Sequence, residues 1–295
     1  MLTIEEILAK FRFQRILSND TKAKIVYVLG EVEGQDCILS FEKTQYEDAI
    51  ISELPIYVDK SSFVDLVENN IYSWCTAALK SNLVDTRIKT IYPATDVHIA
   101  KYEAQARVMV IETPALYESN TIAYIKQIPV KRIQWVHNIL DGSAEADRVI
   151  YHDKDPGTGF VILPDMKWNG SVETLYWVAI AMRSDILSLR SLRSEHLPLL
   201  KKLKQKIYEL VKEKANLSPN QLRLFIHYQP SYYHFHVHIT AVAFTDAPGV
   251  VSGQAHLLDT VINNLELYPD YYQRATLPFV IGERHQLLTD YNWDQ

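Results

Sequence analysis

The sequence predicts an α+β protein in which a smaller β-rich N-terminal part precedes a larger part that combines an antiparallel sheet with helices. Three observations carry this prediction. Short β-branched runs flank a glycine turn signal early in the chain, two longer strand-like runs flank a Gln-Pro-Ser turn near residue 230, and long helical patterns occur in the second half. Such a mixture of unlinked strand and helix signals is typical of α+β folds.

The N-terminal part is expected to open with an amphipathic helix over residues 1–11. Thr3 and Glu6 have the spacing of a capping box, and Ile4, Leu8 and Phe11 share one face. The elements expected next are a hairpin over 24–31 and 37–42, a helical segment over 61–74, a strand over 88–92 and a helix from residue 96 past 102 with Thr95 as its N-cap.

The domain boundary is placed where this last helix begins, although no Gly/Ser-rich linker marks it. Residues 1–94 are expected to form the N-terminal domain, 95–108 a hinge helix and 109–295 the C-terminal domain. The elements expected after the hinge are strands over 148–151, 159–163, 222–228 and 234–244, and helices over 172–182, 197–212 and 256–265.

Composition excludes several classes of function. The net charge of −6 argues against a surface for long nucleic acid, which needs many Lys and Arg on one face, but it allows a short nucleotide in a local pocket. The two cysteines, Cys37 and Cys75, have no paired spacing, so we expect a reducing compartment, the cytoplasm or also the nucleus. No run of eighteen apolar residues occurs, and we expect no membrane span.

The strongest local signal is the run His234-Phe-His236-Val-His238. In a strand, residues at i, i+2 and i+4 point to the same face, and His227 on the preceding strand could join them. A zinc site is one interpretation, but the outer two histidines would be about 13 Å apart at the rise of a strand, too far to share one ion. A nucleophilic imidazole whose flanking histidines orient it and handle protons fits better, and purely structural histidines are the third interpretation.

The longer stretch HYQPSYYHFHVHITAVAF resembles the scavenger mRNA decapping branch of the histidine-triad superfamily. The resemblance implies a C-terminal histidine-triad domain and a homodimer with exchanged N-terminal domains. It implies hydrolysis of the triphosphate bridge of a 7-methylguanosine cap dinucleotide or short capped RNA. His236 would form a covalent nucleotidyl intermediate, assisted by His234 and His238, and neither a metal nor another cofactor would be needed.

The segment 133–148 resembles the cap-binding segment of the same family. By this resemblance Trp135 would stack on the cationic methylated base, and Glu145 would accept hydrogen bonds from the guanine edge. The segment 159–169 resembles a second cap-contacting loop. There Met166, where the family more usually has Leu, would cover the other face of the base, Asp165 would be a polar contact and Lys167 would meet phosphate.

Other positions match more weakly. Tyr176, expected on the helix after this loop, matches a nucleotide contact, and His227, Ser231 and Tyr232 match positions around the phosphates. Gln254 stands where the family pattern suggests an Arg, which removes one expected phosphate contact.

The first half resembles the family in scattered segments. Asn69 and Tyr72 would reach the cap from the exchanged domain, and Lys101 would approach phosphate from the hinge helix. Two other functions stay open: a dinucleoside polyphosphate hydrolase of the histidine-triad group, which has no use for a methyl-purine sandwich, and a non-catalytic cap-binding protein.

Overall fold

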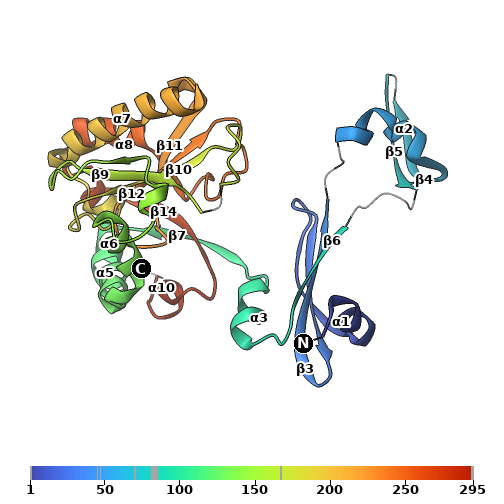
Figure 1. The fold of residues 1–295 in the computed structure, drawn as a ribbon. Coiled ribbons are helices and arrows are strands. Elements are labelled where there is room, and N and C mark those ends of the chain that lie inside the picture. The colour runs from blue at the N-terminus through green and yellow to red at the C-terminus, as the bar shows by residue number, and fades with distance from the viewer. Residues whose placement is uncertain are drawn as a thin grey trace. The chain divides into compact units, whose positions relative to one another are not determined.

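The computed structural model describes residues 2–44, 46, 48–69, 71–80, 86–166 and 168–293 (Figure 1). The chain divides into two compact units, residues 1–104 and 105–295. The α+β fold class is confirmed: the first unit is rich in strands, and the second combines an antiparallel sheet with helices.

The first helix, α1 (Ile4–Lys10), begins at the predicted capping box. The Thr3 hydroxyl accepts the Glu6 N–H, and the Glu6 carboxylate accepts the Thr3 N–H at 2.8 Å. The predicted apolar face was wrong in part, because Ile7 is the buried residue while Ile4 and Leu8 are exposed. Ile7 and Phe11 have the same i, i+4 spacing as Ile4 and Leu8, and it is the former pair that packs against Val32 and its neighbours.

Four strands of the first unit form one antiparallel sheet in the order β1–β2–β3–β6. Their bounds are β1 (Arg12–Asp20), β2 (Ile25–Val32), β3 (Gln35–Lys43) and β6 (Thr86–Ile91). The predicted hairpin is confirmed as β2–β3. Glu33 and Gly34 form its two-residue turn with φ of 51° and 79°, as a type I′ connection requires.

The helical segment expected over 61–74 is wrong. This stretch belongs to a second hairpin, which follows the short helix α2 (Leu54–Tyr57) and consists of β4 (Val58–Asn69) and β5 (Tyr72–Leu79). Its pairing runs from Val58 opposite Leu79 to Asn69 opposite Tyr72. The cross-strand pairs override an apolar spacing that happened to match a helix.

The predicted N-cap of the next helix is confirmed, since α3 (Asp96–Tyr102) follows Thr95. The Thr95 hydroxyl lies 2.9 Å from Nδ1 of His98, and the Thr95 N–H donates to the same nitrogen. α3 groups with the first unit, and its action as a hinge stays a prediction.

A six-stranded antiparallel sheet organises the second unit, in the order β13–β11–β12–β10–β9–β8. Its strands are β8 (Tyr151–His152), β9 (Phe160–Pro164), β10 (Tyr176–Ala181), β11 (Leu222–His227), β12 (His236–Ala241) and β13 (Ala255–Leu257). A separate antiparallel pair joins β7 (Arg107–Glu112) to β14 (Leu277–Gly282).

The two faces of the sheet pack against different helices. One face, with Ile162, Ala179 and Val237, contacts α7 (Leu197–Ala215) and α8 (Leu258–Leu267), which lie together over the sheet in Figure 1. The opposite face packs its residues from β9 and β10 against α6 (Gln134–Leu140). The remaining helices of this unit are α4 (Pro114–Leu116), α5 (Ile122–Gln127), α9 (Tyr271–Arg274) and α10 (Gln286–Thr289).

Several expectations for this unit need correction. The helix over 172–182 is wrong, because this segment contains β10 in the middle of the sheet. The strand expected from His234 begins at His236, and the helix expected from His256 begins at Leu258 because His256 lies in β13. β8 begins only at Tyr151, after a helical turn over Ala146–Arg148. The helix over 197–212 and the antiparallel pairing of β11 with β12 are confirmed.

A buried ion pair fixes the segment that follows β11. Arg190 Nε donates to Glu112 at 2.9 Å, and both side chains are fully buried. Glu112 also accepts hydrogen bonds from the Tyr228 hydroxyl and from the Gln229 amide. Since these two residues directly precede Pro230 and Ser231, the ion pair anchors the start of the loop that leads to the histidines.

None of the helices in the described part of the chain has the length and apolar content needed to cross a bilayer.

Candidate active site

Three imidazoles meet on one face of the sheet. His236 and His238 lie on β12 opposite Ile180 and Val178 of β10, so both rings are on the face that packs against α6. His227, the last residue of β11, places its ring centroid 4.1 Å from that of His238. All three rings are buried.

His234 lies just before the strand. Its Nε2 donates to the carbonyl oxygen of Ala181 at 2.7 Å, and its own carbonyl oxygen accepts from the His236 ring. Burial lowers the pKa of His234, so its ring is neutral at pH 7. His234 therefore contributes a backbone acceptor to its neighbour and ties the end of β10 to the start of β12.

The hydrogen bonding of His236 settles which nitrogen is available. Nδ1 lies 2.8 Å from the His234 carbonyl oxygen, and because a carbonyl only accepts, Nδ1 carries the proton. The lone pair of the neutral ring is then on Nε2, which is buried and has no hydrogen-bond partner among the described residues. Burial lowers the pKa of His236 to about 4, against the opposing effect of the bond to His234. At neutral pH the site therefore presents an uncharged, nucleophilic nitrogen.

Tyr176 supports the next histidine. Its hydroxyl lies 3.0 Å from Nδ1 of His238, and burial raises the pKa of Tyr176, which keeps the hydroxyl protonated. The residue is the first of β10 and not part of a helix as the sequence suggested. Phe225 of β11 stacks on the His238 ring, with centroids 5.3 Å apart.

A row of aromatic rings leads from the His236 ring to the surface. Tyr232 stacks on His236 with centroids 4.1 Å apart, and the Trp135 indole meets Tyr232 edge-on at 4.9 Å. Trp135 is 44% exposed although it lies on α6, whose Val136 and Ile139 are buried in the core. A half-exposed indole on a well-anchored helix is suited to stack on a flat ligand.

Glu145 is held by a partner that the sequence did not suggest. It has a positive φ of 53° and begins a helical turn that brings Arg148 back to its carboxylate. The second guanidinium nitrogen of Arg148 donates to the Pro164 carbonyl oxygen at 3.0 Å. Arg148 therefore ties the Glu145 turn to the loop that begins after β9.

That loop carries three more residues expected at the cap, Asp165, Met166 and Lys167. The Asp165 N–H donates to the Tyr176 carbonyl oxygen at 3.0 Å. The Asp165 charge adds to burial in raising the pKa of Tyr176 and of Tyr232, which places the carboxylate near both rings. Met166 is 84% exposed, and Lys167 lies outside the described residues.

Comparison with known proteins shows the family of the chain. Residues 134–249 match the family model "Scavenger mRNA decapping enzyme C-term binding", and residues 6–105 match "Scavenger mRNA decapping enzyme (DcpS) N-terminal". The chain is 40% identical over 276 residues to an m7GpppX diphosphatase of Ascaris suum, covering 93% of this chain and 91% of the relative. It is 36% identical to that of Schizosaccharomyces pombe, with 97% of each chain covered, and 38% identical to that of Homo sapiens, covering 94% and 84%.

The chain belongs to the scavenger mRNA decapping enzyme family.

The resemblance to the scavenger decapping family also implied contacts with the cap for three residues of the first unit. Tyr72 begins β5 and is 66% exposed, and it pairs across the hairpin with Asn69, the last residue of β4. Lys101 lies in α3 with its ammonium 5.3 Å from the Tyr102 ring centroid. Their contacts with a cap stay a prediction.

Within the described ranges of this scavenger decapping family member, no group of three or more His, Cys, Asp or Glu side chains is arranged to hold a metal ion.

Proposed function

We propose that the chain is an m7GpppX diphosphatase that cuts the triphosphate bridge of a 7-methylguanosine cap dinucleotide or short capped RNA. The observation that carries the proposal is the free Nε2 of His236, whose lone pair is fixed by the Nδ1–H bond to the His234 carbonyl. Nearly full-length similarity to m7GpppX diphosphatases supports the choice of substrate.

In the first step Nε2 of His236 attacks the phosphorus that bears 7-methylguanosine. An N–P bond forms, the bond from that phosphorus to the bridging oxygen breaks, and its electron pair leaves on the diphosphate of the other nucleotide. Hydrogen bonds from Ser231 and from the His238 ring, whose Nδ1 lies against the Tyr176 hydroxyl, would offset charge on the phosphoryl oxygens. Lys167 is proposed to add a positive charge there.

In the second step water attacks the same phosphorus. The N–P bond breaks, its electron pair returns to Nε2, and the water proton passes to solvent through the neighbouring His227 and His238. The products are 7-methylguanosine monophosphate and a diphosphate-ended nucleotide. We propose that His234 holds the His236 ring in one tautomer throughout.

The methylated base is proposed to lie between Trp135 and Met166. The exposure of both side chains and the fixed carboxylate of Glu145 support this slot. Asp165 and Tyr232 would contact the ligand between the base and the triad.

We further propose a homodimer in which the first unit is exchanged and brings Asn69, Tyr72 and Lys101 to the cap. The match of residues 6–105 to the N-terminal family model supports the family arrangement. Two free cysteines support the proposal of a reducing compartment, the cytoplasm or also the nucleus.

Product identification tests the function. The purified chain is incubated in chelator with methylated and unmethylated cap dinucleotides, and we expect 7-methylguanosine monophosphate and nucleoside diphosphate from the methylated substrate. Failure to release these products, or loss of activity in chelator, would contradict the proposal.

Trp135→Ala separates cap hydrolysis from general dinucleoside polyphosphate hydrolysis. Loss of a stacked cationic base predicts a drop in kcat/KM for the methylated cap of roughly tenfold, with little change for the unmethylated one. Equal effects on both substrates would favour the general hydrolase.

His236→Asn tests whether the chain is an enzyme or a cap-binding protein. If this variant releases product as fast as the parent, the product does not arise at His236, and the chain is a binding protein.

A further inference from the structure

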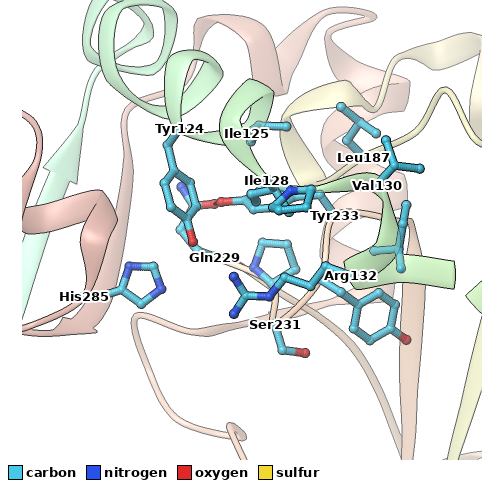
Figure 2. A pocket seen from close by; sticks show the side chains of 14 residues that line it. Tyr124, Ile125, Ile128, Val130, Arg132, Leu187, Gln229, Ser231, Tyr233 and His285 are labelled. Carbon is cyan, nitrogen blue, oxygen red and sulfur yellow. Dashed lines mark hydrogen bonds between the residues drawn. The ribbon is translucent and has the colours of Figure 1, made fainter. Parts of the chain in front are cut away.

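A pocket of about 230 Å³ lies beside the loop that carries Ser231 and Tyr232. Its walls come from α5, from residues 128–130, 132 and 133, from Leu187, from residues 229–233 and from His285 before α10. Figure 2 shows these side chains around the cavity. None of the three histidines of the run lines it, but Ser231 and Tyr232 do, so the cavity adjoins the surroundings of His236.

Four polar groups around this pocket are available to donate hydrogen bonds. Among the described residues, the Arg132 guanidinium and the hydroxyls of Tyr124 and Ser231 make no side-chain hydrogen bond or ion pair. Nδ1 of His285 accepts the Leu287 N–H at 3.1 Å, so the proton of its neutral ring is on Nε2. In Figure 2 the Arg132 guanidinium, the Tyr124 hydroxyl and the His285 ring face the same space.

The charge in the pocket is positive. No Asp or Glu is among the described residues that line it. Burial is the main cause that lowers the pKa of His285, and the Arg132 charge adds to it. The guanidinium therefore lies near that ring. The Asp290 charge reaches the Tyr124 hydroxyl, but the lining itself has one positive charge, several donors and no carboxylate, which favours an anionic group such as a phosphate.

The rest of the wall is apolar or aromatic and rigid. Ile125, Ile128 and Leu187 supply apolar surface, and the Tyr233 hydroxyl donates to Gln229 at 2.9 Å. Gln229 donates in turn to the buried Glu112 at 3.2 Å, so this side of the wall is fixed before any ligand arrives. An anion site next to a flat apolar wall fits a nucleotide, because proteins hold single-stranded RNA with arginines and aromatic or apolar platforms.

Tyr232 connects the pocket to the candidate active site. It lines the pocket and also stacks on His236, whereas Trp135 touches Tyr232 without lining the pocket. The pocket therefore adjoins the proposed cap slot and is not part of it.

We propose that this pocket holds one nucleotide of the RNA fragment attached to the cap, with a phosphate against Arg132 and the base against the apolar wall. The proposal rests on the proposed function and adds the place where the RNA part is bound.

The test compares Arg132→Gln with Lys131→Gln, which removes the same charge from an exposed neighbour that does not line the pocket. KM and kcat are measured at several salt concentrations with a cap dinucleotide and with a capped pentanucleotide. Arg132→Gln should raise KM for the capped pentanucleotide roughly five- to tenfold at unchanged kcat. The slope of log KM against log salt should fall by about 0.7, as expected for one lost phosphate contact, and Arg132→Lys should keep the parental slope.

Comparing KM for the cap dinucleotide and the capped pentanucleotide shows which nucleotide of the RNA lies in the pocket. An equal rise in KM for both substrates places the first nucleotide after the bridge in the pocket, and a rise for the pentanucleotide alone places a later one there. Equal KM and salt slopes for Arg132→Gln and Lys131→Gln with both substrates would overturn the proposal.

Binding of an uncapped 5′-diphosphate pentanucleotide, followed by fluorescence anisotropy, separates this proposal from the proposed function. If the parent hydrolyses no cap but binds this RNA several-fold more tightly than Arg132→Gln, the result supports RNA binding in the pocket and contradicts the proposed cap hydrolysis. If the parent hydrolyses caps and both proteins bind the RNA equally, the result contradicts RNA binding in the pocket and leaves the proposed cap hydrolysis supported.

Discussion

The proposed chemistry depends on the protonation of one ring. Burial moves the pKa of His236 from 6.5 to about 4, so the neutral form dominates at every pH above about 4. The rate of the first chemical step in a single turnover should therefore stay constant as the pH falls through 6.5 and should decline only near pH 4. A decline with its midpoint at 6.5 would mean that the ring is solvated in the working enzyme.

Arg148 gives a second prediction for a single residue. It pairs with Glu145 and with the Pro164 carbonyl, and both ionic side chains are about one-third exposed. Arg148→Gln should loosen the carboxylate and raise KM for the methylated cap about fivefold, the effect of roughly 1 kcal/mol for a partly exposed charged pair, at nearly unchanged kcat. Steady-state kinetics measure both constants.

A double-mutant cycle supplies the control for Arg148. If Arg148 acts through Glu145, the effects of Arg148→Gln and Glu145→Gln on KM should not add. Additive effects, or a drop in thermal stability that accounts for the whole change, would assign Arg148 a structural role instead.

Some residues could be predicted from the sequence and others could not. The alternation of His236, Val237 and His238 puts imidazoles on one face and a core residue on the other, and the structure has this arrangement. Arg148 has no such signal, because its contact with Glu145 depends on a positive φ that the sequence around Glu145 does not announce.

At the level of elements, strands without alternation were the hardest to predict. Every residue of β10 is buried, so the strand reads as a continuous apolar run that periodicity cannot distinguish from a buried helix. β4 carries apolar residues at 63 and 67, a helical spacing, yet pairs with β5 at both of its ends, with two irregularities between them. Successive side chains of β12 point to opposite faces of the sheet, and the sequence predicted this strand, although its start was placed two residues too early.

The buried ion pair between β7 and the segment before α7 gives a prediction about stability. Arg190→Met leaves the fully buried Glu112 without its cation, which should lower the free energy of unfolding by about 3–5 kcal/mol. Arg274→Met removes an exposed partner, 3.7 Å from Asp270, and should cost less than about 1 kcal/mol. Urea unfolding measures both, and equal losses would contradict the distinction between the buried and the exposed pair.

Considered as a whole, the molecule places the histidines, the half-exposed Trp135 and the pocket beside Ser231 in the second unit. The pocket draws its walls from four stretches that are far apart in sequence, between residues 124 and 285, so no local pattern could predict it. The histidine run and its flanks lie within one stretch of about eighteen residues, which is why the family could be inferred from them.

The most direct test of the central claim is to trap the intermediate. Cap dinucleotide labelled at the phosphorus next to 7-methylguanosine is mixed with excess protein, quenched in alkali, which preserves phosphorus–nitrogen bonds, and digested for mass spectrometry. The account predicts the 7-methylguanosine monophosphate adduct on Nε2 of His236 and no adduct in His236→Asn. An adduct on another side chain, or full turnover by His236→Asn, would contradict it.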